Sequence, residues 1–448
     1  MQYVQPPDFL TMPKNKTDKI QAAVKLLMEY EKHPAKADEF LEHQYSLLYK
    51  YGEERRFCQF IFLTVLRNKR LIDEILALFL KKQPRPMLFA LLKCASAEIA
   101  ASAQDKCPQI IHSWVEYAKN LCSLGESKLA NAVLRRFSEK FSALKSGAKT
   151  LSDFSLLYSH PLWLAKRFSQ NFGEENAVEI MRKNQDPSEV FLRVQNTPQA
   201  MEEAKKYARF LDECEFENFF KIKAGALESV KPILQTPYAY IQDPATRFAP
   251  ELLDPKKSEK ILDLCAAPGG KSRAIADIVR KKSPEGFLRD TLLASVDKDS
   301  PRLGRLKENL SKIDFLKTAC VACDLEAEDL QDALSKSNLP TQFDAILIDA
   351  PCSNTGVLRR RPDARWRLKE SDIFSCKKIQ ISIIKNALPL LKDGGRLVYS
   401  TCSIDPEENL QAPREAIKDS GEYKIVSSRT ILPGTTDGAG LCLIKKIR

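Results

Sequence analysis

Four short apolar segments in the second half of the chain alternate with helical segments, and this alternation limits the fold more than any other feature. Helical periodicity fills the intervals, as at Pro301–Lys312 and Ile379–Leu391. Such alternation predicts a doubly wound, mostly parallel sheet covered by helices on both faces, the Rossmann-like α/β class. Ligands of these folds bind beyond the carboxyl ends of the strands. The four predicted strands are Ile261–Cys265, Leu292–Val296, Phe343–Ile348 and Arg396–Tyr399.

The residues before Pro244 have a different pattern and predict two further domains. From Lys19 to about Lys145, apolar residues recur every three or four positions, which is typical of packed helices. A short β-rich block follows, with strand-like segments at Val190–Val194 and Phe219–Ile222 and, between them, a helix start at Thr197 and Pro198 before Met201–Leu211. A chain of 448 residues is long enough for two or three cores. We therefore expect an all-helical domain over residues 1–145, a small α/β linker domain over 146–240 and the doubly wound domain over 241–448.

Composition narrows the compartment, the partners and the chemistry. No apolar run approaches the roughly 18 residues that span a bilayer, and the polar start, Met1–Lys19, is unlike a secretory signal. We therefore expect a cytoplasmic protein without a membrane partner, and its net charge of +11 favours polyanions. All four histidines lie before Pro161, which excludes histidine-dependent catalysis from the second half. The single Cys-x-x-Cys, Cys320 and Cys323, has no second pair, so we expect no metal site.

The first predicted strand ends in a turn of small residues that opens a helix, a shape that lets a ligand approach the backbone closely. A phosphate-binding loop would need glycine in place of Cys265, and a dinucleotide fingerprint would need three glycines that are absent. The second strand ends near Asp297, where doubly wound folds commonly hold a ribose diol. The turn and Asp297 together predict a nucleoside cofactor without pyrophosphate, S-adenosylmethionine. Asp324, after a third strand-like segment, is a candidate acceptor for its adenine amino group.

Two cysteines follow the last two predicted strands. Asp349 and Cys352 come just after one strand and Cys402 after the other, so all three face one cleft if these strands are neighbours. Carbon 5 of cytosine is a poor nucleophile, but addition of a thiolate to carbon 6 gives an enamine that attacks a methyl sulfonium. A carboxyl group at N3 would stabilise the adduct, and a second thiol would assist elimination. Two thiols and a carboxyl group in one cleft would therefore be useful for methylation of a cytosine at carbon 5.

A cytosine must leave its stack to reach such a cleft, so a basic and aromatic rim is expected. An arginine-rich segment supplies candidates, although a solvated loop is the alternative interpretation. Because this half has no histidine, another group must activate the nucleophilic thiol, and Lys271 is a candidate. The rim candidates are Arg359, Arg360, Arg361, Arg365, Trp366, Arg367 and Lys369.

Several segments resemble the signatures of the RNA 5-methylcytosine methyltransferases of the Fmu/Sun/RsmB type. In the helical domain, Asn131-Ala-Val-Leu-Arg-Arg136 is similar to the NusB-like RNA-binding domain of the bacterial small-subunit ribosomal RNA enzymes. The resemblance covers nearly the whole chain. It implies a monomer that uses S-adenosylmethionine to methylate carbon 5 of a cytidine, with 16S ribosomal RNA or an assembling small subunit as its partner. The catalytic-domain signatures are Asp263-Leu-Cys-Ala-Ala-Pro-Gly-Gly-Lys271, Asp349-Ala-Pro-Cys-Ser353 with Thr355-Gly356, and Tyr399-Ser-Thr-Cys-Ser-Ile-Asp-Pro-Glu-Glu-Asn409.

The resemblance also implies roles for individual residues. Cys402 would be the nucleophile, Cys352 would help to release the product, and Asp349 would contact the cytosine. Two departures from the family pattern stand out: Asp437-Gly-Ala-Gly-Leu441 lacks the aromatics of the usual Asp-Gly-Phe-Phe-like strand, and Pro413 interrupts a helix that is usually continuous. The implied cofactor site comprises Cys265, Ala266, Ala267, Pro268, Gly269, Gly270, Lys271, Asp297, Arg302, Asp324 and Asp349.

Two other functions remain as alternatives. A DNA cytosine methyltransferase would attack through the cysteine of a Pro-Cys pair, here Cys352, and Cys402 would then be incidental. A catalytically silent RNA-binding assembly factor would need neither thiol. The NusB-like start and the position of Cys402 after its own strand favour an RNA enzyme over a DNA enzyme. The presence of Asp349, Cys352 and Cys402 together disfavours a silent binder.

Overall fold

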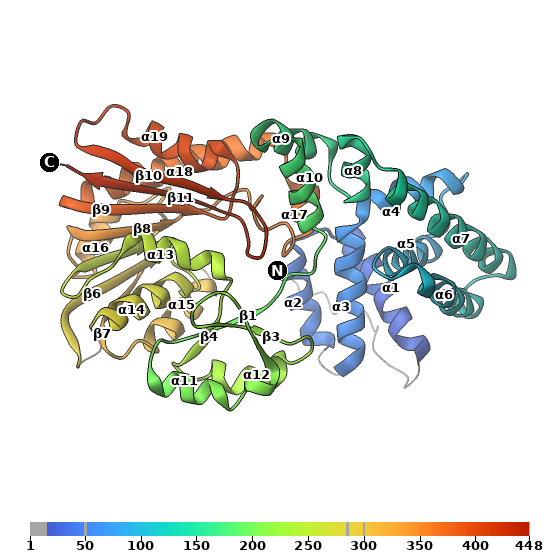
Figure 1. Cartoon of the computed structure of the whole chain (residues 1–448), viewed down its shortest axis with the longest axis horizontal. Helices are drawn as coiled ribbons and strands as arrows, with labels where there is room; N and C mark the ends of the chain where they lie inside the picture. The colour runs from blue at the N-terminus through green and yellow to red at the C-terminus, as the bar shows by residue number, and fades with distance from the viewer. Residues whose placement is uncertain (1–15, 49–51, 284–285, 299–300, 448) are drawn as a thin grey trace, which may run out of the picture. The chain divides into compact units, whose positions relative to one another are not determined.

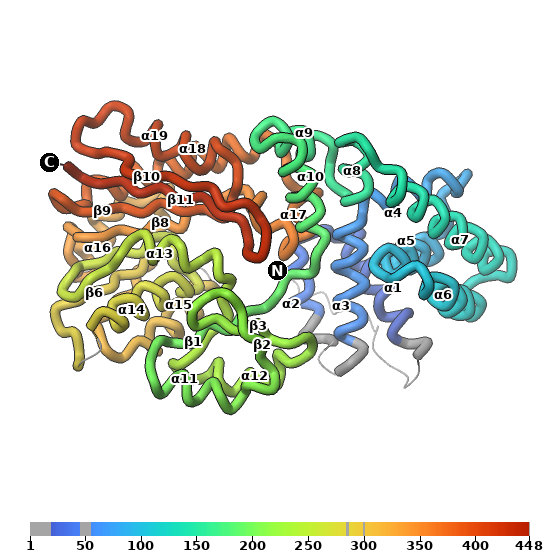
Figure 2. Tube along the Cα trace, viewed as in Figure 1, coloured from blue at the N-terminus to red at the C-terminus, as the bar shows by residue number. Residues whose placement is uncertain are grey.

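The computed structural model describes residues 16–48, 52–283, 286–298 and 301–447, which form two compact units (Figure 1). The first unit contains the described residues up to Asp186 together with Leu358–Arg367. The second contains Pro187–Val357 and the described residues from Leu368 onward. Figure 2 colours the chain trace by residue number. Within these ranges, no helix is long and apolar enough to cross a membrane. Most of Met1–Lys19, on which the prediction about a secretory signal rests, lies outside the described residues.

The first unit is a bundle of helices around α5 (Pro86–Ala100). Most side chains of α5 are buried, because α1, α3, α6 and α7 pack around it. A capping box between Ser123 and Glu126 starts the long helix α7, as the two side chains bond each other's backbone N–H groups. The other helices are α1 Lys16–Lys32, α2 Ala37–Leu48, α3 Gly52–Arg67, α4 Lys69–Phe79, α6 Cys107–Leu121, α7 Leu124–Gly147, α8 Leu151–Leu157, α9 Leu162–Phe172, α10 Glu174–Lys183 and α17 Ala364–Arg367.

The arginine-rich segment contributes a buried side chain to this first unit, so its prediction as an exposed rim is wrong for Arg365. Its guanidinium is fully buried and donates hydrogen bonds to the carbonyls of Arg67 (3.2 Å), Ser159 (3.1 Å) and Asn184 (3.0 Å). Arg67 ends α3 and Asn184 follows α10, so both carbonyls belong to helix C-termini, which lack partners within their helices. Burial and the nearby Arg67 lower the pKa of Arg365 to about 9. This value is still above neutral pH, so the guanidinium stays charged. Arg359 is buried as well.

A small antiparallel sheet opens the second unit, in the order β2-β3-β1-β4. The strands predicted near residues 190–194 and 219–222 are confirmed as β1 and β3. The helix start predicted at Thr197 and Pro198 is confirmed, because Thr197 caps α11. The predicted end is wrong, because α11 ends at Lys205 and Leu211 already pairs with Ile222 in the sheet. The elements are β1 Phe191–Val194, α11 Pro198–Lys205, β2 Leu211–Glu213, β3 Phe219–Ile222, α12 Leu227–Leu234 and β4 Ala239–Ile241.

The large sheet has the order β10-β11-β9-β8-β5-β6-β7. Strands β5 to β9 pair in parallel, whereas β10 and β11 form an antiparallel edge, which confirms the predicted mostly parallel, Rossmann-like class. The strands are β5 Lys260–Leu264, β6 Leu288–Asp297, β7 Leu316–Ala322, β8 Phe343–Asp349, β9 Leu391–Thr401, β10 Tyr423–Ile431 and β11 Ala439–Lys446. The helices of this part are α13 Phe248–Leu253, α14 Gly270–Lys282, α15 Pro301–Ser311, α16 Leu330–Lys336, α18 Glu370–Ala387 and α19 Ala412–Ile417.

The register of the large sheet brings the ends of its central strands together. Leu264 pairs with Ile348, and Asp349 pairs with Ser400, so β5, β8 and β9 end at one edge. The helix predicted at Ile379–Leu391 is wrong in its bounds: α18 begins at Glu370, and Leu391 already belongs to β9. The first turns of α18 are largely polar and exposed, so apolar periodicity detects only the second, more buried half of this helix.

Candidate active site

The turn after β5 presents backbone at the edge of the sheet. Cys265 has a left-handed φ of 57°, and Gly269 has a φ of 104°. A Cβ at Gly269 would lie 3.0 Å from Cβ of Asn309 and 3.1 Å from Cδ1 of Leu306, so both space and φ favour glycine. The N–H of Gly269 donates to the carbonyl of Ala266 at 2.7 Å, which closes the turn. The helix α14 begins directly afterwards, at Gly270.

Two charged side chains from the next elements brace this turn. Oδ2 of Asp297, at the end of β6, accepts a hydrogen bond from the N–H of Ala267 at 2.8 Å. Arg302, in the first turn of α15, donates a hydrogen bond to the carbonyl of Ala267. Because a carboxylate has two oxygens, Asp297 can hold the turn and a ribose hydroxyl together. The turn and Asp297 therefore fit the nucleoside of the predicted cofactor.

Asp324 lies two residues beyond β7. Its Oδ2 pairs with Nζ of Lys298 at 2.6 Å, and this hydrogen bond lowers the pKa of Asp324. The backbone N–H of Cys323 donates to the carbonyl of Asp297 at 2.9 Å, so the two aspartates follow adjacent strand ends. The contact of Asp324 with adenine remains a prediction.

Lys271 and Asp349 form an ion pair between α14 and the end of β8. Nζ of Lys271 lies 2.6 Å from Oδ2 of Asp349, and Ser400 donates to the other carboxylate oxygen at 3.2 Å. Burial lowers the pKa of Lys271, but the carboxylate of Asp349 and the nearby Cys402 outweigh it and raise the pKa above its usual value. The amine therefore stays protonated and keeps a positive charge beside Asp349.

The two cysteines of the sequence motifs meet beside this pair. Sγ of Cys352 and Sγ of Cys402 lie 2.9 Å apart, although 50 residues separate them in the chain. Oδ1 of Asn354 accepts a hydrogen bond from the Cys402 thiol at 3.3 Å. The hydrogen bond with Cys402 and burial hold the pKa of the Cys352 thiol well above its usual value, so Cys352 is protonated at neutral pH. The pairing of β8 with β9 therefore brings the two thiols together.

A buried carboxylate that the sequence analysis missed connects the two cysteine loops. Glu408 accepts hydrogen bonds from the hydroxyls of Ser353 and Ser403, which directly follow Cys352 and Cys402. Gln380 of α18 donates to the other oxygen of Glu408 at 2.9 Å. Burial raises the pKa of Glu408, and these hydrogen bonds limit the rise. A serine after each cysteine, with Glu408 in the same motif as Cys402, was a signal in the sequence for this link.

Comparisons with known proteins match both halves of the chain. The 16S rRNA methyltransferase RsmB/F family matches residues 250–437, and the NusB family matches residues 19–139. A probable ribosomal RNA small subunit methyltransferase B of Bacillus subtilis is 30% identical over 375 residues, covering 80% of this chain and 79% of that protein. The chain belongs to the RsmB/F methyltransferase family. Methyltransferases of this family use S-adenosylmethionine, which agrees with the predicted methyl donor.

Two further similarities agree with membership of the RsmB/F family. The ribosomal RNA small subunit methyltransferase B of Yersinia enterocolitica is 33% identical over 336 residues, covering 71% of this chain and 73% of that protein. The solved structure of PH0851 has a TM-score of 0.69 at 22% identity and covers 98% of this chain and 100% of that one, so the two share a fold. The predicted family, fold class and NusB-like domain are thus confirmed.

The two departures from the family pattern lie next to the cysteine loops. Gly438 donates to the carbonyl of Gly356 at 2.8 Å, and a Cβ on Gly440 would fall within 1.9 Å of Oδ1 of Asn409. The Asn409 side chain thus occupies the space beside Gly440, where an aromatic residue has no room. Pro413 is near the start of α19, directly after a π-helical turn at Glu407–Gln411, so it begins a helix here and does not break one.

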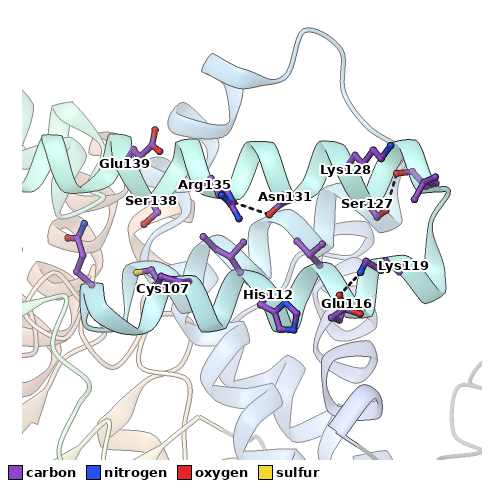
Figure 3. Close-up of a pocket in the computed structure, with 15 residues that line it drawn as sticks. Cys107, His112, Glu116, Lys119, Ser127, Lys128, Asn131, Arg135, Ser138 and Glu139 are labelled. Carbon is purple, nitrogen blue, oxygen red and sulfur yellow. Dashed lines mark hydrogen bonds and ion pairs between the residues drawn. The ribbon is translucent and has the colours of Figure 1, made fainter.

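The NusB-matched part of the chain has an open groove of about 860 Å³ between α6 and α7 (Figure 3). Lys128, Asn131 and Arg135 of α7 line it, opposite His112 and Lys119 of α6. Glu116 neutralises Lys119, as their side chains lie 2.5 Å apart.

Among the residues that the structure describes, no group of three or more potential metal ligands comes together.

Proposed function

We propose that the protein methylates carbon 5 of a cytidine in 16S ribosomal RNA through a covalent bond between Sγ of Cys402 and carbon 6 of the base. The observation that carries this proposal is the 2.9 Å separation of the Cys352 and Cys402 sulfurs beside the Lys271–Asp349 ion pair. Two thiols at adjacent strand ends suit a reaction in which one thiol adds to a ring and the other assists its departure. We expect a cytoplasmic monomer whose substrate is the RNA or an assembling small subunit.

Each side chain of the cleft has a task in this mechanism. Lys271 is the proposed activating group for Cys402, whose thiolate adds to carbon 6 and makes carbon 5 nucleophilic. Asp349 contacts the N3 edge of the base. Bound S-adenosylmethionine supplies an electrophilic methyl group, for which the turn 265–271, Asp297, Arg302, Asp324 and Asp349 form the proposed site. After carbon 5 gives its proton to solvent water, the C5–C6 double bond re-forms and the C6–S bond breaks. The protonated Cys352 donates a hydrogen bond to the departing thiolate of Cys402.

The identity of the product tests this function directly. Incubation of the protein with 16S ribosomal RNA and S-adenosylmethionine should yield 5-methylcytidine, detected by mass spectrometry of the digested nucleosides. RNA that carries 5-fluorocytidine should form a covalent complex, because fluorine at carbon 5 cannot leave as a proton does. Methylation at a different cytidine atom, or of DNA in place of RNA, would refute the proposal. A protein that only binds RNA would produce no methylated nucleoside.

The proposed ribose contact predicts a measurable loss of cofactor affinity. Asp297→Ala should weaken S-adenosylmethionine binding by about 10- to 100-fold, because hydrogen bonds to a charged group contribute roughly 1.5–3 kcal/mol. Calorimetric titration measures this affinity without RNA. Asp290→Ala is the matched control, since Asp290 is an exposed aspartate on the same strand, β6. Equal affinities of the two variants would remove Asp297 from the site.

A further inference from the structure

Asn354 occupies the one position of the Cys352 loop that the family signature leaves open, between Ser353 and Thr355. Its φ is 65°, in the left-handed region that most residues with a side chain avoid. Asparagine tolerates this region better than most residues, and glycine tolerates it at no steric cost. Glycine would therefore satisfy the backbone conformation at this position, so the backbone does not explain why the residue is asparagine.

The side-chain amide of Asn354 bridges the two active-site cysteines. Oδ1 accepts a hydrogen bond from the Cys402 thiol at 3.3 Å, and Nδ2 donates to the backbone carbonyl of Cys352 at 2.8 Å. The second hydrogen bond fixes the orientation of the amide, because a flipped amide would set its oxygen against the Cys352 carbonyl. The amide thus offers the Cys402 sulfur an acceptor in a fixed place.

We propose that Asn354 is a positioning residue that holds the Cys402 sulfur beside Cys352, in position to add to carbon 6 of the base. This inference rests on the proposed function, since it assigns Asn354 a part in placing the nucleophile. A nucleophile must stand within a few tenths of an ångström of its productive position, and one fixed hydrogen bond removes much of the freedom of a thiol about its Cα–Cβ bond. The hydrogen bond exists while Cys402 is a thiol, so it sets the sulfur in place before the thiol loses its proton and acts as the nucleophile.

Two variants separate this role from a need for the backbone conformation. Asn354→Gly keeps the left-handed φ and removes both hydrogen bonds. Asn354→Asp keeps the size and the acceptor but sets a negative charge beside the sulfur, which disfavours the thiolate. Asn338→Gly is the matched control, because Asn338 also has a left-handed φ, of 54°, and follows α16, outside the cysteine loops.

Alkylation by iodoacetamide and methyl-transfer kinetics provide the two readouts on the full-length protein. Trypsin separates the thiols, since Cys402 lies in the peptide Leu397–Arg414 and Cys352 in Ser337–Arg359. Asn354→Gly should alkylate Cys402 several-fold faster, and Asn354→Asp should alkylate it several-fold more slowly. Both should lower kcat for methyl transfer about tenfold or more and leave KM for RNA within twofold. Asn338→Gly should match the wild type in both assays.

Wild-type kcat in Asn354→Gly, or alkylation that shifts in the same direction in both variants, overturns the inference and leaves the proposed function intact. A Cys402→Ala variant that still methylates RNA overturns the proposed function instead, whatever the alkylation data show. A purely structural role for Asn354 would lower the melting temperature without moving the two alkylation rates apart.

Discussion

A Cys402→Ala variant is expected to lose methyl transfer on the order of 10⁴-fold or more and to form no covalent complex with 5-fluorocytidine RNA. Without the thiolate, carbon 5 of the cytosine stays a poor nucleophile, and loss of a covalent nucleophile typically removes most of an enzyme's rate. The protein should remain folded and bind S-adenosylmethionine as before, since the hydrogen bonds by which Asp297 and Arg302 brace the turn after β5 do not involve this thiol. Single-turnover transfer of a labelled methyl group and denaturing electrophoresis of the complex measure the two losses.

Cys352→Ala should give the opposite result with unmodified RNA. The nucleophile remains, so the adduct forms, but the departing sulfur loses its neighbour at 2.9 Å and the covalent complex accumulates. Cys214→Ala controls for removal of a half-buried thiol, because Cys214 lies between β2 and β3 of the small sheet. The reverse pattern, in which Cys402→Ala traps RNA and Cys352→Ala forms no adduct, would make Cys352 the nucleophile and favour the mechanism of the DNA enzymes.

The strand ends of the catalytic domain were predictable because buried parallel strands are nearly continuous apolar segments. Asp349 and Cys402 were identified by position alone, as the residues just beyond such segments. Their meeting depends on the adjacency of β8 and β9, which is a matter of topology and which no local pattern encodes. The resemblance to the RsmB/F family supplied that information, and the sheet order confirms it.

Charged residues were the main source of error. Arg365 was interpreted as exposed because an isolated charge is costly to bury, but carbonyls at the C-termini of two helices offset that cost. Glu408 was missed because a charged residue is expected at the surface. Its carboxylate is buried all the same, because it accepts several hydrogen bonds. The contact of Asn354 with Cys402 was also missed, because it depends on a left-handed φ and on a partner 48 residues away. Partners distant in sequence decide each of these cases.

Gly356→Ala is expected to damage the active site through its backbone. A Cβ at Gly356 would lie 2.7 Å from the carbonyl oxygens of Cys402 and Gly438, and neither is the flexible end of a side chain. The N–H of Gly356 also donates to the Cys402 carbonyl at 3.0 Å, so relief of the clash pushes the nucleophile's loop away. We expect a loss of about 2–3 kcal/mol in the free energy of unfolding, as for other overpacked interiors, and a drop in methyl transfer of at least about 100-fold.

Gly304→Ala separates this steric effect from a general cost of adding a methyl group. Gly304 lies inside α15, and a Cβ there would meet nothing within 4 Å. Alanine is the better helix former by roughly 1 kcal/mol, so this variant should be as stable as the wild type or slightly more so. Thermal unfolding and single-turnover methyl transfer compare the two variants. If Gly356→Ala matches Gly304→Ala in both, the Cys402 loop yields without cost, and the close packing of Gly356 against Cys402 and Gly438 does not hold the nucleophile in place.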